Sequence, residues 1–480
     1  MRSPSWSSLL VLPFLLLVSS IGASLDESQQ QEQSPQQCSP RPLEVVLETP
    51  LFTSNSYAVV GSFLALALHS RPDVNLRLVR LSNFVSSWPA LDAFDERRSA
   101  LLHAIPMVSR LPPPSSSSSE SSESTSDTSS TDDARVAHTP ADVTVRVTID
   151  FDGPQVPSSS TLVLATTENG YLAQEVIWGS SSPRLNPNGV LVVVPSEWSR
   201  SGMLNSGVKA EDVFVVPHGI DCDLFGPLPA DERDRRRADK GWDKSFVFLN
   251  ISAMTANKNP DLLILAFEDL TKRFNNLKLV LKGNDDLYRS ELLLLSSPTT
   301  GAVFQRLRSQ GLIEYYGGQM SFSEIALLHQ LSDTYVSPYS FEGFNLPVLE
   351  AMSVGNPVVV TRGGSTDDFV PDDGSFGYKV DADLVVKDAY QKLSGKQAVE
   401  DEGTIRQDDG LYITAKVMYL KVSLPSLVDK MVLAVLESAE WRAKIPERIA
   451  FVRQTYSWTK IAERIIELGV KAAKAANDKN

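Results

Sequence analysis

The chain has 480 residues, of which 42% are hydrophobic and 22% are charged, so it can form about two or three domains with a large buried core. Its formal net charge of −14 gives no basic surface and argues against a nucleic-acid partner. It has 2 cysteines, Cys38 and Cys222, so we expect neither a disulfide scaffold nor a metal cluster.

Residues 1–23 have the pattern of a secretory signal. Arg2 supplies a positive end, Leu9–Val18 an apolar core and Ser20–Ser24 small residues around a cleavage site. The apolar run is shorter than the about 20 residues that cross a bilayer. A signal anchor is the alternative, because Ile21 makes the cleavage context imperfect. The sequence therefore predicts entry into the secretory pathway, ending in the endoplasmic reticulum or Golgi lumen.

A first α/β domain is predicted over residues 43–235, after a disordered stem at 24–42 that is rich in Ser, Gln and Pro. Within it, residues 112–133 are a Ser/Glu/Asp/Thr run that cannot bury a core, so we expect a disordered insert. The expected elements are strands at Leu43–Glu48, Val143–Ile149, Leu162–Thr166, Val190–Val194 and Val213–Val216, a helix at Ser62–His69 and a helix opened by Ser196.

A second domain is predicted over residues 242–445, after a charged linker between Pro229 and Trp242. Alternating strands and helices of this length indicate a doubly wound parallel sheet. The expected strands are Phe246–Ile251, Leu277–Lys282, Ile313–Tyr316 and Tyr335–Pro338, with one helix after Asn259 and Pro260 and another capped by Ser323 and ending near Leu331. Residues 381–423 lack clear periodicity and are interpreted as an insertion.

The C-terminal segment, residues 446–480, is predicted to be helical. After Ser457, one helical face carries Trp458, Ile461, Ala462, Ile465 and Leu468. A single apolar face indicates that this helix packs on the body of the protein.

The segment Ser337–Thr361 carries two carboxylates around a turn that enters a short helix. Glu350 follows Glu342 by eight positions. The helix is predicted from Asn345 as N-cap, with Pro347 in its first turn and Gly355 at its C-terminal cap. Glu350 is therefore expected in the first turn, where a carboxylate in an apolar helix is costly to bury unless it accepts hydrogen bonds. Ligand hydroxyls can donate them, and so can the backbone of a neighbouring loop.

Three candidate binding elements each follow a predicted strand of the second domain: Lys258, Glu342 and the Gly363–Gly364 turn. Because a parallel α/β sheet binds ligands beyond the carboxyl ends of its strands, we expect them to converge on one edge. Lys258 also precedes a helix, where a bound anion would offset the repulsion between the lysine and the helix dipole. A solvated lysine is the simpler alternative for Lys258 alone.

The segment resembles the signature of the family 4 retaining glycosyltransferases, which have the GT-B fold. The matching residues are Glu342, Gly343, Phe344, Leu346, Pro347, Glu350, Ala351, Gly355 and Pro357, with Asn345 in place of a usual glycine. The continuation Gly363, Gly364, Thr366, Asp367, Asp368 and Phe369 is similar to one subgroup of that family. The resemblance implies an α/β protein with two Rossmann-like doubly wound domains facing a central cleft, and a terminal helix that crosses back toward the first domain.

The resemblance also implies a nucleoside diphosphate sugar as donor and a retained anomeric configuration. It would place Lys258 on the diphosphate, Glu350 on the ribose hydroxyls and Glu342 near the transferred sugar as the catalytic residue. The remaining implied donor-binding residues are Gly343, Phe344, Asn345, Leu346, Gly363 and Gly364. The acceptor, which is an unknown glycan, lipid or protein, and the identity of the hexose do not follow from the sequence.

Two departures from the family favour an alternative function. Ala253 stands where the family has an arginine five residues before the lysine, and no histidine of the first domain is evident as an active-site residue. A catalytically weak or inactive sugar-nucleotide binding protein is therefore one alternative, and a sugar-nucleotide epimerase on the same fold is another.

No metal or other cofactor is expected. Three Asp-x-Asp triplets occur, at Asp150/Asp152, Asp221/Asp223 and Asp381/Asp383. Paired carboxylates suit hard cations, but three occurrences in an acidic chain are consistent with chance. We interpret them as structural or solvated residues.

Overall fold

The computed structural model describes residues 41–52, 56–81, 93–108, 139–148, 156–171, 190–392, 404–407, 410–443 and 445–478. The predicted signal, nearly all of the stem and the Ser-rich insert lie outside these residues, as does Cys38. No helix within the described ranges is both long and apolar enough to cross a membrane.

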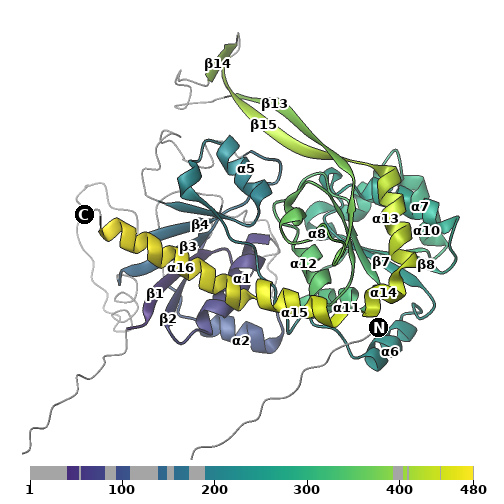
Figure 1. The fold of residues 1–480 in the computed structure, drawn as a ribbon, viewed down its shortest axis with the longest axis horizontal. Coiled ribbons are helices and arrows are strands. Elements are labelled where there is room, and N and C mark those ends of the chain that lie inside the picture. The colour runs from purple at the N-terminus through teal and green to yellow at the C-terminus, as the bar shows by residue number, and fades with distance from the viewer. Residues whose placement is uncertain are drawn as a thin grey trace, which may run out of the picture. The chain divides into compact units, whose positions relative to one another are not determined.

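The first sheet has six parallel strands in the order β2-β1-β3-β4-β5-β6, of which Figure 1 labels β1 to β4. Most residues of its central strands are buried, which is typical of a parallel sheet covered by helices on both faces. The strands are β1 (Leu43–Thr49), β2 (Val74–Arg80), β3 (Ala141–Val147), β4 (Ser158–Leu164), β5 (Leu191–Val194) and β6 (Val213–Val215).

Helices α1 (Ser56–His69), α2 (Glu96–Ala104) and α5 (Glu197–Asn205) accompany this sheet. Helix α1 begins at Ser56, six residues before the expected start at Ser62. Its first turns contain β-branched residues and Gly61, which are poor helix formers, so burial overrides local propensity here. Gly61 is required by close packing, because a Cβ atom there would lie 1.8 Å from Thr49 Oγ1. Ser196 caps α5 as expected, accepting a hydrogen bond from the Ser199 amide.

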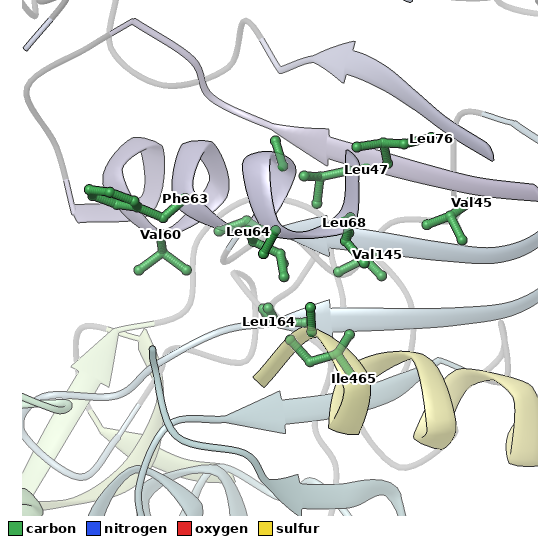
Figure 2. Packing of buried hydrophobic residues seen from close by; sticks show 14 of the residues in the cluster. Val45, Leu47, Val60, Phe63, Leu64, Leu68, Leu76, Val145, Leu164 and Ile465 are labelled. Carbon is green, nitrogen blue, oxygen red and sulfur yellow. The ribbon is translucent and has the colours of Figure 1, made fainter. Parts of the chain in front are cut away.

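The terminal helix α16 (Trp458–Asn477) packs on the first sheet, which confirms the apolar face predicted for it. Helices α1 and α16 contribute to one core cluster, and Figure 2 shows Ile465 of α16 beside Leu164 of β4 and near Leu64 and Leu68 of α1. The chain therefore passes from the first sheet to the second and returns to the first. Helices α14 (Ser438–Ala443) and α15 (Ile445–Tyr456) precede α16.

The second sheet is also parallel and six-stranded, in the order β12-β11-β10-β7-β8-β9. Its strands are β7 (Phe246–Ile251), β8 (Leu277–Lys282), β9 (Ile313–Tyr316), β10 (Thr334–Ser337), β11 (Val358–Thr361) and β12 (Gly377–Val380). Its helices are α7 (Pro260–Thr271), α8 (Asp285–Tyr288), α9 (Ser290–Ser296), α10 (Gly301–Ser309), α11 (Phe322–Leu331), α12 (Leu346–Ser353) and α13 (Leu424–Leu436). Two doubly wound parallel sheets confirm the predicted α/β architecture.

The charged stretch between the sheets differs from the expected linker. Residues from Ala230 to Asp239 form helix α6, and Arg237 within it is buried. Arg237 reaches the carboxylate of Asp333 at 3.1 Å, and Arg233 reaches the same carboxylate at 2.9 Å. These ion pairs fasten the stretch to the second sheet.

Helix α11 is capped by Ser321 rather than by the expected Ser323. Ser321 accepts from the Glu324 amide, and the Glu324 side chain accepts from the Ser321 amide, which forms a capping box. The expected end near Leu331 is correct.

The insertion at residues 381–423 is largely β-structure. Strand β13 (Ala382–Lys392) pairs with β15 (Gly410–Val422) in antiparallel fashion, and β14 (Thr404–Gln407) pairs with the far end of β15. Figure 1 shows this β-arm running from the second sheet past helix α5. The sequence did not predict these strands.

Candidate functional site

Two loops of the second sheet are fastened together, and this brings Lys258 to Glu342. The loop after β7 ends at Asn259, which adopts the left-handed conformation, with φ 51°. Its amide nitrogen Nδ2 donates to the Pro338 carbonyl at 2.7 Å and to Ser340 Oγ at 2.9 Å. The Ser340 amide in turn donates to the Asn257 carbonyl at 2.7 Å. The expected convergence of these two strand ends is therefore present.

Lys258 Nζ and Glu342 Oε1 form an ion pair of 2.6 Å, and both side chains are largely buried. Burial disfavours the charged form of Lys258, but the negative charges of Glu342 and Glu168 outweigh it and hold the pKa of Lys258 above its ordinary value. Burial raises the pKa of Glu342 despite Lys258, and the charge of Glu168 adds to this rise. Lys258 therefore stays protonated, with Glu342 as its ion-pair partner and Glu168 as a second negative charge that favours the ammonium.

The loop from Gly343 to Leu346 presents unused backbone donors at the start of α12. Asn345 stands at the N-cap with φ 78°, and its side chain donates to Ser337 Oγ rather than capping the helix. Within the described part of the chain, the amides of Phe344, Asn345 and Leu346 donate no hydrogen bond to another protein group. A helix N-terminus with open amides is suited to a phosphate or carboxylate.

Glu350 lies in the second turn of α12, and the prediction that placed it in the first turn is wrong. Because Asn345 is the N-cap, the helix begins at Leu346 and Glu350 is its fifth residue. Its carboxylate oxygen Oε2 lies 3.1 Å from Nε2 of His329, a wholly buried residue of helix α11. The buried carboxylate thus has a side-chain partner that neither the ligand nor the loop interpretation named.

The Gly363–Gly364 turn lies against Tyr339 and the β-arm. Gly363 has φ 88°, and its amide donates to Asp367 at 2.7 Å. A Cβ atom on Gly364 would lie 2.6 Å from the Tyr339 hydroxyl, so only glycine fits there. Leu420 of β15 covers both glycines.

The edge of the first sheet meets the signature loop at Gly343. Ser196 Oγ donates to the Gly343 carbonyl at 2.7 Å, and Ser199 Oγ lies 3.2 Å from the same carbonyl. A Cβ atom on Gly343 would lie 2.0 Å from Thr166 Oγ1. Close by, the Glu197 amide donates to Asp368 at 2.6 Å. The N-terminus of α5 is therefore joined to the residue that follows Glu342.

Glu168 brings a further carboxylate from the first sheet to this place. It lies in the loop after β4, it is exposed, and its carbonyl accepts from Trp198 Nε1 at 2.6 Å. Thr166 of the same loop contacts Gly343. The site therefore has the carboxylates of Glu168 and Glu342 near the ammonium of Lys258.

The β-arm spans the two edges. On strand β15, the Met418 amide donates to the Asn169 carbonyl at 2.8 Å, and the Leu420 amide donates to the Ser340 carbonyl at 2.7 Å. Met418 and Leu420 also pack in one apolar cluster with Trp198 and Tyr339. The arm thus holds the loop that carries Glu168 near the loop that leads into Glu342.

Within the described residues, no group of three or more His, Cys, Asp or Glu side chains is arranged to hold a metal ion. Asp221 is bonded to Arg98 Nε at 2.7 Å and to the amides of Asp223 and Leu224. Asp381 accepts from Ser426 Oγ at 3.1 Å. Asp150 and Asp152 lie outside the described residues.

The family model for glycosyl transferases group 1 matches residues 232–393. Mannosylfructose-phosphate synthase of Agrobacterium fabrum is 27% identical over 161 residues, which are 33% of this chain and 34% of that protein. A GDP-mannose-dependent phosphatidylinositol monomannoside mannosyltransferase of Mycolicibacterium smegmatis is 26% identical over 205 residues, which are 41% of this chain and 50% of that protein. The chain thus spans half or less of the length of these two relatives.

Solved structures match over nearly the whole chain. Anabaena HepE in complex with UDP and glucose has a TM-score of 0.56 and 15% identity, covering 89% of this chain and 99% of that one. Sucrose-phosphate synthase from Thermosynechococcus elongatus has a TM-score of 0.57 and 13% identity, covering 90% and 100%. The fold is GT-B. The matched residues 232–393 include β7 to β12 and every residue that the sequence assigned to the donor site.

Two residues near the candidate site, His329 and Glu168, were not predicted from the sequence. His329 lies between Leu328 and Gln330 on helix α11, and a histidine that is buried on a helix needs a polar partner. Glu168 follows strand β4, and polar residues at the carboxyl ends of parallel strands are candidates for ligand binding. Both signals were present in the sequence, but neither names the partner.

Proposed function

We propose that the protein is a retaining glycosyltransferase that moves a hexosyl unit from a nucleoside diphosphate sugar to an acceptor. Lys258 and the open amides of Phe344, Asn345 and Leu346 bind the diphosphate in this proposal. Glu350 binds the ribose hydroxyls, and Glu342 acts beside the transferred sugar. The Gly363–Gly364 turn, which Leu420 of β15 covers, completes the donor site in this proposal.

The observation that carries the proposal is the arrangement around Glu342. A protonated lysine contacts Glu342 at 2.6 Å, and a helix begins four residues later with amides that have no partner within the described part of the chain. Donors aimed at a leaving diphosphate stabilise the negative charge that develops on it, which is usually a large part of catalysis. The ammonium and the amides supply such donors, and no metal ion is needed in this proposal.

The comparisons support the donor class. The relative from Mycolicibacterium smegmatis is named as GDP-mannose-dependent, and the Anabaena structure holds UDP and glucose. We infer a nucleoside diphosphate hexose for this chain, and an acceptor that is a glycan, lipid or protein.

The test is turnover by the full-length protein with a panel of UDP- and GDP-hexoses. We expect one donor to raise the melting temperature and to release its nucleoside diphosphate, faster in the presence of the right acceptor. NMR of the first product should show the anomeric configuration of the donor. An inverted product would overturn the retaining assignment, and a donor panel with neither binding nor turnover would overturn the proposal as a whole.

A catalytically weak or inactive sugar-nucleotide binding protein is the second candidate. It is favoured by Ala253, because the family resemblance implies an arginine at that position beside Lys258. The positive charge of Lys258 must then balance both Glu342 and Glu168 before Lys258 can bind a diphosphate. Such a protein would bind the donor and leave it intact. An epimerase would instead alter the donor without any acceptor, so the same assay separates the three functions.

We also propose that the protein enters the secretory pathway and reaches the endoplasmic reticulum or Golgi lumen. The support is Arg2 followed by the apolar run Leu9–Val18. A fusion of residues 1–45 to a fluorescent reporter should leave the cytosol. A cytosolic reporter would overturn this localisation.

A further inference from the structure

The pair formed by His329 and Glu350 is costly for stability and lies within an apolar layer. His329 is fully buried and the Glu350 side chain is 12% exposed. Apolar residues that are at most 3% exposed flank both side chains: Ala326, Leu328 and Leu331 on α11, and Val348, Leu349 and Ala351 on α12. Two polar side chains in such a place need a reason beyond packing.

The hydrogen bond to Glu350 determines which ring nitrogen of His329 acts as the donor. A carboxylate accepts only, so Nε2 of His329 must carry the proton that it donates to Glu350 Oε2. The other ring nitrogen, Nδ1, is buried and has no hydrogen-bond partner among the described residues. An unsatisfied buried polar atom destabilises a fold, so this pair costs more than two apolar residues of similar size.

The histidine itself is held firmly. Its backbone carbonyl accepts from Asn356 Nδ2 at 2.6 Å, and its ring lies 5.4 Å from that of the buried Tyr335 and 6.3 Å from that of Phe225. A ring packed in this way cannot follow a moving carboxylate. It therefore fixes one oxygen of Glu350 in place.

We propose that His329 is a positioning residue that orients the Glu350 carboxylate toward the vicinal ribose hydroxyls of the donor. Oε2 is occupied by the imidazole, while Oε1 has no hydrogen-bond partner in the described part of the chain and remains for the ligand. The pair is then kept at the expense of stability because it pre-organises the nucleotide site. This inference rests on the proposed function, since it assigns a residue to the same donor site.

The binding test uses the full-length protein with UDP or GDP, whichever binds the wild type more tightly, and with its 2′,3′-dideoxy analogue. His329→Leu should weaken the nucleoside diphosphate about tenfold, the usual scale for a hydrogen bond to a charged group. His329→Gln keeps a donor near the position of Nε2 and should stay within about threefold of wild type. The dideoxy analogue should bind His329→Leu and wild type equally, because neither complex has the ribose contact. His103→Leu, at an exposed histidine of α2, is the control and should bind both ligands as wild type does.

The dideoxy analogue decides between positioning and simple damage to the fold. If His329→Leu loses affinity equally for both ligands, or if His329→Gln is as weak as His329→Leu, the positioning role is overturned. Wild-type protein that binds neither UDP nor GDP would overturn the proposed function.

A stability cycle tests the inference without any ligand. His329→Leu and Glu350→Met should each lower the melting temperature, because each leaves a buried partner unpaired. The double variant should equal or exceed the wild type, since both polar groups are gone. A double variant less stable than both single variants would show that the pair serves the fold, and would overturn the inference.

Discussion

The two sheet edges that meet at Gly343 differ in the functional side chains that they carry. The edge of the second sheet carries the Lys258–Glu342 ion pair, the open amides before α12 and the carboxylate of Glu350. The edge of the first sheet uses the hydroxyls of Ser196 and Ser199 to bond the backbone of the signature loop. One edge therefore holds side chains that can act on a ligand, and the other holds the loop that presents them.

This division explains where the sequence motif is strong. A ligand-binding edge needs particular side chains at fixed spacing, whereas contacts to a backbone carbonyl can come from several small polar residues. Among the residues that the structure describes, the first sheet brings the charged side chain of Glu168, which follows β4, near the ion pair. If the division is correct, changes on the second edge should affect chemistry and binding, and changes on the first should affect the junction.

The largest effect is expected from Glu342→Gln. The variant keeps the shape of the side chain but removes the charge beside the transferred sugar, so turnover should fall by about 100-fold or more. The donor should bind nearly as well, because the lost interaction is made mainly in the transition state. Turnover and donor affinity would be measured on the same preparation, with Glu211→Gln, at an exposed glutamate, as control. Equal losses in binding and in turnover would assign Glu342 to binding alone.

Glu350→Gln should have a smaller effect, and on binding rather than on chemistry. The neutral amide weakens both the bond from His329 and the bond to the ribose, so donor affinity should fall about tenfold. Turnover at saturating donor should change by less than the affinity does. Calorimetric titration of the donor measures the first quantity, and unchanged affinity with an intact fold would remove Glu350 from the ribose site.

Gly343→Ala tests the junction from the side of the loop. The added Cβ would lie 2.0 Å from Thr166 Oγ1, so the two edges must separate or shift. Overpacking of this kind costs about 1–3 kcal/mol, and the melting temperature should fall accordingly. Gly318→Ala is the matched control, because a Cβ there meets nothing within 4 Å. Adding Thr166→Ala to Gly343→Ala should restore part of the loss, and no recovery would show that the clash lies elsewhere.

The sequence predicted the strands of the second sheet better than the strands of the β-arm. Strands β7, β8 and β9 have the predicted bounds, because each is an apolar run bounded by turn residues. The pairing of Ala382 with Val422 in the β-arm joins residues far apart along the chain, and no local pattern reports such a partner. The sequence also predicts that the first helix begins only after Gly61, because glycine is a poor helix former. In the structure the helix continues through Gly61, where close packing against Thr49 leaves no room for a side chain.

The candidate site follows the same rule. Glu342 was singled out by the signature and Lys258 by its place between a predicted strand and a helix, and the convergence of strand ends predicted that they lie close together. The partner of Glu350 could not be predicted, because His329 lies 21 residues earlier on a different helix. Contacts between helices depend on tertiary packing, which the spacing within one helix does not contain.

The smallest expected effect concerns His218, at the first-sheet side of the junction. Its ring lies 5.0 Å from that of Phe344, and burial lowers the pKa of His218 to about 3. An unfolded chain protonates histidine near pH 6.5, so between pH 6.5 and 3 the unfolded state binds more protons than the folded state. The stability contribution of neutral His218 is therefore complete above pH 6.5 and is lost as the pH falls. The loss cannot exceed about 1.4 kcal/mol per pH unit for one group.

His218→Phe keeps an aromatic ring and removes the titration, so its stability should fall less steeply than that of wild type between pH 6.5 and 4.5 in urea unfolding. The experiment compares how steeply the free energy of unfolding changes with pH in the two proteins. A difference between wild type and His218→Phe in stability at pH 7.5 therefore does not affect the result. Equal slopes would mean that the ring of His218 is hydrated in the folded protein, and that the junction is open to water on this side.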